Sequence, residues 1–486
     1  MKQINFIVLA IIGLAIRLWL VPQWVDAVKS DESRQFNQYA VNLVEHGVYS
    51  DDTGANPVPN ARRAPHYPLF LASVYKWAGC DNLRAVQIVQ AVLDLITCWL
   101  VYRTARELFR DRLVGYWSYG TALIATPLVV FTGYLLPETL ATLWTTLAVF
   151  CALKACRDNR NAWFVGLGIS CGAAVLTKPM LIALPVFLLP AFFVTPEGRR
   201  FFTAKRAALL VLCGLVLFLP WVTRNFVSLH RFNVLASCHA NVQDDAARGY
   251  HHWLSTWTDS QANRPLIAAV EGQGEAFKPD QLPSVDKFPN YAFDSDQERA
   301  VVSGLLRQVY VQMKLAPDTD AAFGKLANEK IRRHPVRYYV FLPLFRMVML
   351  WAEPLSPYWF AKASAPNGEP SQSSISPSRQ PFIKAPARAV RYAQMINLAI
   401  VAFGFGGLWV IRHHWRDAAP LMLAMLACTV AGGLACFCVA YVDPRAVVPV
   451  YPQMCIFASA CAFHLTRAKS PLKTSTEIYE PDYDRW

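Results

Sequence analysis

Charged residues are scarce in this sequence. Asp, Glu, Lys and Arg together make up 17% of its 486 residues, whereas hydrophobic residues make up 54%. A soluble chain of this length normally divides into two or three domains with charged surfaces, and this composition excludes that organisation. A soluble parallel sheet contains short apolar runs, but the apolar stretch from Ala207 to Val222 is too long for one strand. The sequence therefore predicts an all-α polytopic membrane protein.

The hydrophobic residues fall into long blocks of about 20 residues, which is near the length that a helix needs to cross a bilayer. About ten spans are expected, at 5–22, 84–102, 113–132, 136–153, 161–177, 179–195, 205–222, 391–411, 418–441 and 446–465.

Basic loops indicate the orientation, because short loops rich in Lys and Arg stay in the cytoplasm. If 334–353 were counted as a span, the basic loop 412–416 would lie on the outer side of the membrane, where basic loops are disfavoured. Because 334–353 carries Arg337 and Arg346 among aromatic and aliphatic residues, we expect an amphipathic helix on the outer membrane surface. Both termini are then expected in the cytoplasm. The other basic loops, all on one side, are 103–112, 154–160 and 199–206.

Long polar segments divide the chain into four predicted parts. Residues 1–222 form an N-terminal transmembrane module whose first outer loop is 23–82. Residues 223–388 form an outer region, in which 223–353 is expected to make a small cap over the bundle, and its Ser- and Pro-rich stretch 363–388 is expected to be flexible. Residues 389–467 hold the last transmembrane helices, and 468–486 are a cytoplasmic tail.

Several other features are missing. The sequence has no nucleic-acid-binding motif, so its net charge of +13 is a signal of membrane topology. It has no convincing internal repeat, which weighs against transporters built from duplicated halves. Among the cysteines, only Cys80 and Cys238 are expected on the outer side, and independent thiols are favoured there over a disulfide.

Two adjacent carboxylates, Asp31 and Glu32, follow the first span and precede an amphipathic pattern that stops at Gly47. One carboxylate can accept a proton from an acceptor hydroxyl, while the other orients that hydroxyl or binds a metal. Capping of a helix N-terminus explains the same dipeptide when it is taken alone. Basic residues further along the chain favour a catalytic role for these carboxylates over simple helix capping.

These cations lie at the outer ends of several spans, against the usual bias of basic residues toward the cytoplasm. Arg side chains that reach for lipid headgroups are the common alternative. We predict that Arg63, Lys178, Arg224 and Arg445 converge within reach of one phosphate, close to Asp31. Glu138 either holds a neighbouring cation or acts in catalysis. The expected phosphate and donor site comprises Arg62, Arg63, Tyr67, Lys178, Arg224 and Arg445, supported by Glu138, His66 and Asn225.

This order of features resembles the bacterial GT-C glycosyltransferases related to the lipid A aminoarabinose transferases and the protein O-mannosyltransferases. Two departures are the sequence Asp443-Pro444-Arg445, where Glu-x-Arg-Tyr is usual, and the stretch 223–353, which matches no pattern. The matching residues are Asp31-Glu32, Tyr39-Ala40-x-x-Leu43-x-x-x-Gly47-x-Tyr49, Arg63-x-Pro65-x-Tyr67-Pro68-Leu69-Phe70, Leu176-Thr177-Lys178-Pro179, Pro220-Trp221-x-x-Arg224-Asn225, and Asp443-x-Arg445 with Pro449 and Pro452.

The resemblance implies a GT-C helical bundle in the bacterial inner membrane, with its active site on the periplasmic face. Asp31 would be the general base of an inverting displacement at the anomeric carbon of a sugar, and Glu32 would be auxiliary. Arg63, Lys178, Arg224 and Arg445 would hold the leaving phosphate of a polyprenyl-phosphate carrier. The acceptor is a lipid such as lipid A, a glycan or a protein. Some relatives bind a divalent metal near the acidic loop, and the sequence leaves open whether this chain does.

Two alternatives remain. A polysaccharide polymerase or ligase also uses outer-face Arg residues, but its lipid carries a diphosphate and a long glycan. A non-enzymatic lipid-sugar transporter would need polar residues near the bilayer midplane and broken helices in both halves, whereas these spans are mostly apolar at their centres.

Overall fold

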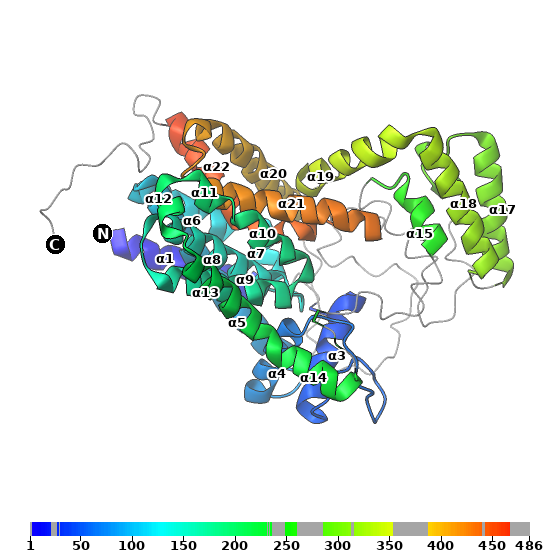
Figure 1. The fold of residues 1–486 in the computed structure, drawn as a ribbon, viewed down its shortest axis with the longest axis horizontal. Coiled ribbons are helices and arrows are strands. Elements are labelled where there is room, and N and C mark those ends of the chain that lie inside the picture. The colour runs from blue at the N-terminus through cyan, green and yellow to red at the C-terminus, as the bar shows by residue number, and fades with distance from the viewer. Residues whose placement is uncertain are drawn as a thin grey trace, which may run out of the picture. The chain divides into compact units, whose positions relative to one another are not determined.

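The computed structural model describes residues 2–20, 27–28, 30–230, 232, 234–235, 248–259, 285–312, 315–352, 387–439 and 443–466. All the regular elements in these ranges are helices, which confirms the all-α class (Figure 1). The chain forms two compact units. The first comprises Met1–Ala236, Pro354–Cys428 and Val447–Trp486, and the second comprises Ser237–Glu353 and Thr429–Ala446.

Nine of the ten expected spans correspond to apolar helices in the described ranges. Five are long and apolar enough to cross a membrane: Leu83–Phe109, Glu138–Arg157, Ala204–Leu229, Arg391–Val410 and Pro444–Thr466. Four are shorter: Ile7–Trp19, Asn161–Thr177, Pro179–Val194 and Ala419–Leu434. The helices of these regions are α1 (Lys2–Ala15), α5 (Leu83–Phe109), α8 (Glu138–Arg157), α9 (Asn161–Thr177), α10 (Ala183–Leu188), α11 (Ala191–Val194), α12 (Pro196–Phe201), α13 (Ala204–Leu215), α14 (Leu219–Leu229), α20 (Ala387–Val410), α21 (Ala419–Val439) and α22 (Tyr451–Thr466).

The remaining expected span, 113–132, is broken into α6 (Arg112–Ile124) and α7 (Thr126–Phe131). Ala125 between them has extended backbone angles, and Pro127 lies in the first turn of α7. In a continuous helix the ring of Pro127 would clash with the carbonyl of Leu123, so the helix stops before it. This break leaves the Leu123 carbonyl without its helical partner, and Arg17 Nη1 donates to it at 3.2 Å.

That arginine belongs to a buried ion pair that joins the first helix to α5. Arg17 lies in a π-helical turn, Ile16–Leu20, and its Nε donates to Asp94 Oδ2 of α5 at 2.6 Å. Both side chains are almost completely buried. Neither residue was predicted as a site from the sequence, although a charged residue within an apolar run is a visible signal in both cases.

Glycines allow close helix packing within the bundle. A Cβ on Gly172 of α9 would lie 2.6 Å from the carbonyl oxygen of Gly214 in α13. A Cβ on Gly407 of α20 would similarly clash with the backbone of Phe457 in α22. Small residues at such positions let helix backbones approach closely, which is a main source of packing energy between membrane helices.

The segment between α1 and α5, predicted as the first outer loop, contains two helices that pack on the bundle. The expected amphipathic helix is α3 (Asp31–Glu45), which starts at a capping box formed by Ser30 and Ser33. A second helix, α4 (His66–Ala78), was not predicted. Phe36 of α3 and Tyr67 of α4 meet edge to face, with ring centroids 5.1 Å apart, inside a core shared with α5 and α7. This core holds the N-terminus of α3 in place.

The second unit has its own hydrophobic core, built around Trp253, Trp257, Phe288 and Phe323. Its helices are α15 (Arg248–Ser255), α17 (Asp296–Gln312), α18 (Pro317–Arg333) and α19 (Leu342–Ala352), with a π-helical turn, Arg337–Phe341, leading into α19. The position of this unit as a cap over the bundle remains a prediction. The predicted loop 363–388, the tail 468–486 and Cys238 lie outside the described residues, and Cys80 is a free, exposed thiol.

Candidate functional site

The acidic dipeptide forms the first turn of α3. Asp31 is the first residue of the helix, and its side chain lies outside the described residues. Glu32 Oε1 accepts a hydrogen bond from Arg63 Nη1 at 3.2 Å. This contact joins two members of the predicted site that are 31 positions apart in the chain.

Two further residues of α3 fix the guanidinium of Arg63. Gln35 Oε1 accepts from Arg63 Nε at 3.0 Å and from Nη2 at 2.6 Å. The guanidinium also lies over the ring of Phe36, 5.4 Å from its centroid. Glu32, Gln35 and Phe36 share one face of α3 because they are three and four residues apart. This helix face therefore presents Arg63, still about one-third exposed, beside the acidic N-terminus.

Arg224 holds the loop that carries Arg63. Its Nη1 donates to the carbonyl of Asn60 at 2.8 Å and its Nη2 to the carbonyl of Tyr49 at 2.9 Å. The hydroxyl of Tyr49 in turn donates to the carbonyl of Arg63 at 3.0 Å. Asn225, which is fully buried, accepts from Arg224 Nη1 at 3.0 Å. In this arrangement Arg224 and Asn225 support the loop, and a direct contact of Arg224 with a phosphate remains a prediction.

Arg62 points to another acidic group. Its Nη1 lies 3.6 Å from Asp51 Oδ2, and the side chain of Arg62 is half exposed. Asn60 Nδ2 donates to Asp51 Oδ1 at 2.7 Å, and the hydroxyl of Tyr39 donates to Asn60 Oδ1. Sequence reasoning missed Gln35, Asp51 and Asn60, because no motif distinguishes them from other loop residues.

A second ion pair lies where α8 begins and α9 ends. Lys178 Nζ is 3.3 Å from Glu138 Oε1, and the Glu138 side chain is only 1% exposed. Glu138 is in the first turn of α8 and Lys178 caps the C-terminus of α9, so each charge lies at the favourable end of its helix dipole. Glu138 therefore contacts the cation Lys178, as expected for a holding role, and a part for Glu138 in catalysis stays a prediction.

The two ion pairs are connected through α4. His66, the first residue of this helix, places Nδ1 3.1 Å from the carbonyl of Ala173 and 2.8 Å from Thr177 Oγ1. Since a carbonyl only accepts, Nδ1 carries the imidazole proton. Burial lowers the pKa of His66, so the ring is neutral at pH 7 and is not one of the cations. Two residues separate Arg63 from His66 in the chain, and Thr177 directly precedes Lys178, so the contact between His66 and Thr177 links the two ion pairs.

Two other predicted residues, Tyr67 and Arg445, make different contacts. The hydroxyl of Tyr67 is fully buried and donates to Gln90 Oε1 of α5 at 2.9 Å, so it fastens α4 to the bundle. Arg445 belongs to the second unit, where its Nη2 contacts Asp443 Oδ2 at 2.7 Å. Convergence of Arg445 with Arg63 and Lys178 remains a prediction.

Metal binding also remains open. In the described ranges, no group of three or more His, Cys, Asp and Glu side chains is arranged to hold a metal ion. The Asp31 side chain lies outside those ranges, and a divalent metal at the acidic turn stays a hypothesis.

Comparisons with known proteins point to the same group of enzymes. Residues 62–223 match the model of the family "Dolichyl-phosphate-mannose-protein mannosyltransferase". An undecaprenyl phosphate-alpha-4-amino-4-deoxy-L-arabinose arabinosyl transferase of Pseudomonas fluorescens is 34% identical, over 29% of this chain and 26% of its own length. The corresponding enzyme of Pseudomonas aeruginosa is 32% identical over the same shares. The chain therefore matches about a quarter of the length of these curated relatives.

Among solved structures, ArnT from Cupriavidus metallidurans, bound to undecaprenyl phosphate, aligns with 92% of this chain and 77% of its own, at 17% identity and a TM-score of 0.42. The oligosaccharyltransferase AglB from Archaeoglobus fulgidus aligns with 96% of this chain and 52% of its own, at 14% identity and a TM-score of 0.45.

The matched segment contains Arg63, His66, Glu138 and Lys178, whereas Asp31 and Glu32 precede it. The resemblance inferred from the motifs is thereby confirmed, and residues 62–223 are related to the glycosyltransferases of the dolichyl-phosphate-mannose-protein mannosyltransferase family.

Proposed function

We propose that this chain is an inverting glycosyltransferase that moves a sugar from a polyprenyl-phosphate carrier to an acceptor on the outer face of the bacterial cytoplasmic membrane. The contact between Glu32 and Arg63 is the observation that carries this proposal, because it places a basic group against the acidic start of α3. The family match of residues 62–223 supports it independently.

The reaction needs a base and a site for a leaving anion. Asp31 takes the proton from an acceptor hydroxyl, whose oxygen forms a bond to the anomeric carbon. The bond between that carbon and the phosphate oxygen breaks on the opposite face, and its electron pair leaves with the polyprenyl phosphate. Inversion at the anomeric carbon follows from this single displacement.

Arg63 and Lys178 are the cations best placed to stabilise the leaving phosphate. Negative charge grows on the phosphate as the glycosyl bond breaks, so fixed cations stabilise the transition state more than the ground state. Glu32 and Glu138 hold these cations at 3.2 and 3.3 Å, where they remain partly exposed. An incoming phosphate can therefore share the cations with their carboxylate partners.

The membrane placement completes the proposal. Basic loops assign 23–82, which includes α3 and α4, to the outer side and both termini to the cytoplasm. The acceptor is a lipid such as lipid A, a glycan or a protein, and membrane lipids surround the apolar helices.

Substitution of the proposed base tests the mechanism. A deletion strain of the native host is complemented with the full chain or with Asp31→Asn, Glu32→Gln or Glu45→Gln, and its envelope glycans and lipids are compared by mass spectrometry at equal protein levels. Because the carboxamide keeps the shape and removes the base, Asp31→Asn should lower transfer by roughly 10²- to 10⁴-fold.

Glu32→Gln should have a milder effect, since it weakens only the hold on Arg63. Glu45 is exposed at the other end of α3, so Glu45→Gln serves as the matched control with parental transfer. Near-parental modification in the Asp31→Asn strain would remove Asp31 from the mechanism.

A further inference from the structure

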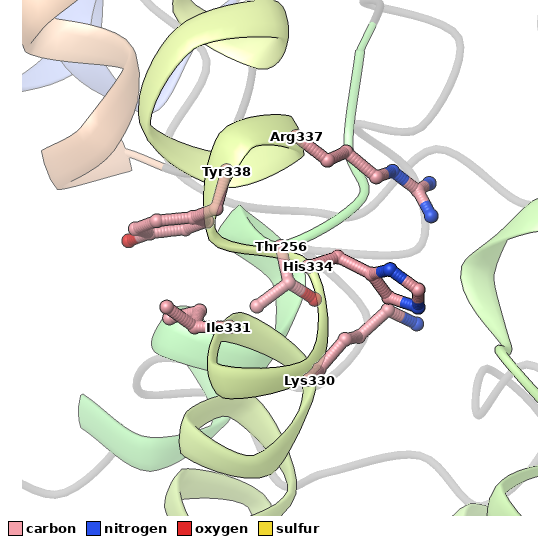
Figure 2. Close-up of a pocket in the computed structure, with 6 residues that line it drawn as sticks. All are labelled: Thr256, Lys330, Ile331, His334, Arg337 and Tyr338. Atoms are coloured by element: carbon pink, nitrogen blue, oxygen red, sulfur yellow. The ribbon is translucent and has the colours of Figure 1, made fainter.

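A hollow in the second unit shows how cations are held when carboxylates match their charge. Its lining residues are Thr256, Lys330, Ile331, His334, Arg337 and Tyr338 (Figure 2). The buried Lys330 Nζ lies 3.1 Å from Glu298 Oε1 and 3.3 Å from Asp294 Oδ1. Arg337 Nη1 lies 3.6 Å from the same Asp294 oxygen. Two carboxylates thus match the two cations, so this cluster stabilises its own unit and has no surplus charge for an anionic ligand.

Arg63 of the proposed donor site has a different pair of partners. One is a carboxylate, Glu32, at 3.2 Å. The other is the neutral amide of Gln35, whose Oε1 accepts from Arg63 Nε at 3.0 Å and from Nη2 at 2.6 Å. Because a guanidinium only donates, the amide has to present its oxygen here. Gln35 therefore fixes Arg63 through two hydrogen bonds without adding a negative charge.

This arrangement leaves part of the guanidinium for a ligand. Of the five N–H groups of an arginine side chain, Gln35 and Glu32 use three. The other two, one on each Nη, have no partner among the described residues, and the side chain is about one-third exposed. A phosphate would meet N–H groups that are already oriented, so little conformational freedom is lost on binding.

A neutral partner also suits the exchange of ligands at Arg63. The amide oxygen of Gln35 attracts the guanidinium less strongly than a carboxylate would, so it can give way to a phosphate oxygen. An additional carboxylate at position 35 would hold Arg63 more tightly, but it would also repel the phosphate. Arg63 would then resemble Lys330, whose two carboxylate partners keep it as part of the fold.

We propose that Gln35 is a positioning residue of the donor site, which holds Arg63 with a neutral oxygen so that the guanidinium can bind the phosphate of the lipid donor. This inference rests on the proposed function. It adds a residue that precedes the family match at 62–223, and it gives the chemical reason for an amide, in place of an acid, at this position.

The test measures how the purified full chain in detergent binds undecaprenyl monophosphate, by native mass spectrometry, with undecaprenol as the reference that lacks the phosphate. Gln35→Glu should weaken binding of the monophosphate by about tenfold or more, as expected for one like charge about 6 Å away in partly solvated surroundings. Binding of undecaprenol should not change. The thermal unfolding midpoint should stay equal or rise, because the new carboxylate pairs with Arg63.

Two further variants separate the charge of position 35 from its oxygen. Asn56→Asp makes the same change from amide to carboxylate at an exposed position between α3 and α4, and it should bind both lipids as the parent does. Gln35→Met removes the oxygen without adding a charge. It should weaken binding of the monophosphate by about fivefold, the cost of ordering an unheld side chain.

A charge exchange completes the test. Gln35→Glu/Glu32→Gln restores one amide and one carboxylate at Arg63, so it should recover most of the binding that Gln35→Glu loses.

Three results would overturn the inference while leaving the proposed function in place. The first is parental binding of the monophosphate by Gln35→Glu, and the second is a double variant that binds it no better than Gln35→Glu. The third is a parallel loss of undecaprenol binding in Gln35→Glu, which would assign Gln35 to the fold. A parent that binds undecaprenol as tightly as the monophosphate would instead contradict the proposed function, and the inference with it.

Discussion

Arg63 and Arg224 look alike in the sequence, since both are arginines expected at the outer ends of apolar segments. The structure gives them different surroundings. Arg63 faces side chains of α3, where Gln35 and Glu32 can yield to a phosphate, whereas the fork of Arg224 is occupied by two backbone carbonyls. One residue is therefore suited to ligand binding and the other to holding the loop.

This difference predicts separate consequences of substitution. Arg63→Ala should lower sugar transfer by about 10²-fold, as expected for the loss of one transition-state contact, with little change in the thermal unfolding midpoint. Arg224→Ala should lower the free energy of unfolding by about 2 kcal/mol or more, because hydrogen bonds to charged groups contribute about 1.5–3 kcal/mol each.

Arg224→Lys should not restore stability, since one ammonium cannot reproduce a fork that reaches both Tyr49 and Asn60. Thermal unfolding in detergent, followed beside the transfer assay, checks both variants. Equal loss of stability in Arg63→Ala would show that Arg63, too, mainly holds the fold.

At the residue scale, the sequence named candidate site residues but did not predict which of them pair. Glu32 and Arg63 were both named, but their pairing depends on how α3 and the following loop fold together. Glu138 and Lys178 were likewise named without being joined. Arg17 and Asp94 were visible as charges in apolar runs, yet only the break before Pro127 explains the need for a donor at Leu123.

At the scale of the elements, the long apolar helices could be predicted from their composition, whereas most of the short helices could not. The amphipathic pattern predicted α3, whereas α4, whose third residue is Pro68, was not predicted. Proline is tolerated in the first turn of a helix, where the missing N–H has no partner to lose. In the second unit, α19 lies within the helix expected over 334–353. The other helices of this unit were missed because their weak polar periodicity gives little signal until Trp253 and its neighbours form a core.

The placement of the segment 334–353, which contains α19, decides the predicted membrane topology. If 334–353 lies on the outer surface, single-cysteine variants should react with a membrane-impermeant reagent at positions within 23–82, 223–353 and 363–388. Positions within 103–112, 154–160, 412–416 and the tail should be protected, because positive loops stay in the cytoplasm.

The loop 363–388 is decisive in this labelling experiment. Protection of its cysteines in whole cells, with reaction after permeabilisation, would show that 334–353 crosses the membrane and that the number of spans is wrong.

At the scale of the whole molecule, the family match covers a shorter stretch of the chain than the stretch over which the proposed site residues are spread. Residues 62–223 carry the match, whereas the acidic dipeptide precedes it and Arg445 follows it. The contact of Glu32 with Arg63 connects the unmatched start of the chain to the matched segment. Residues 223–353, which include most of the second unit, match no pattern of the resembling family, so the sequence indicates the acceptor only as a lipid, a glycan or a protein.

The central claim is that a sugar leaves a polyprenyl monophosphate with inversion at the anomeric carbon. The most direct measurement supplies the purified full chain and an envelope extract with undecaprenyl-monophosphate sugars, including the aminoarabinose of the curated relatives, and determines the anomeric configuration of the product by NMR. We predict transfer from a monophosphate donor with the configuration inverted. Retained configuration, or transfer only from a diphosphate-linked glycan as in a polymerase or ligase, would contradict the account.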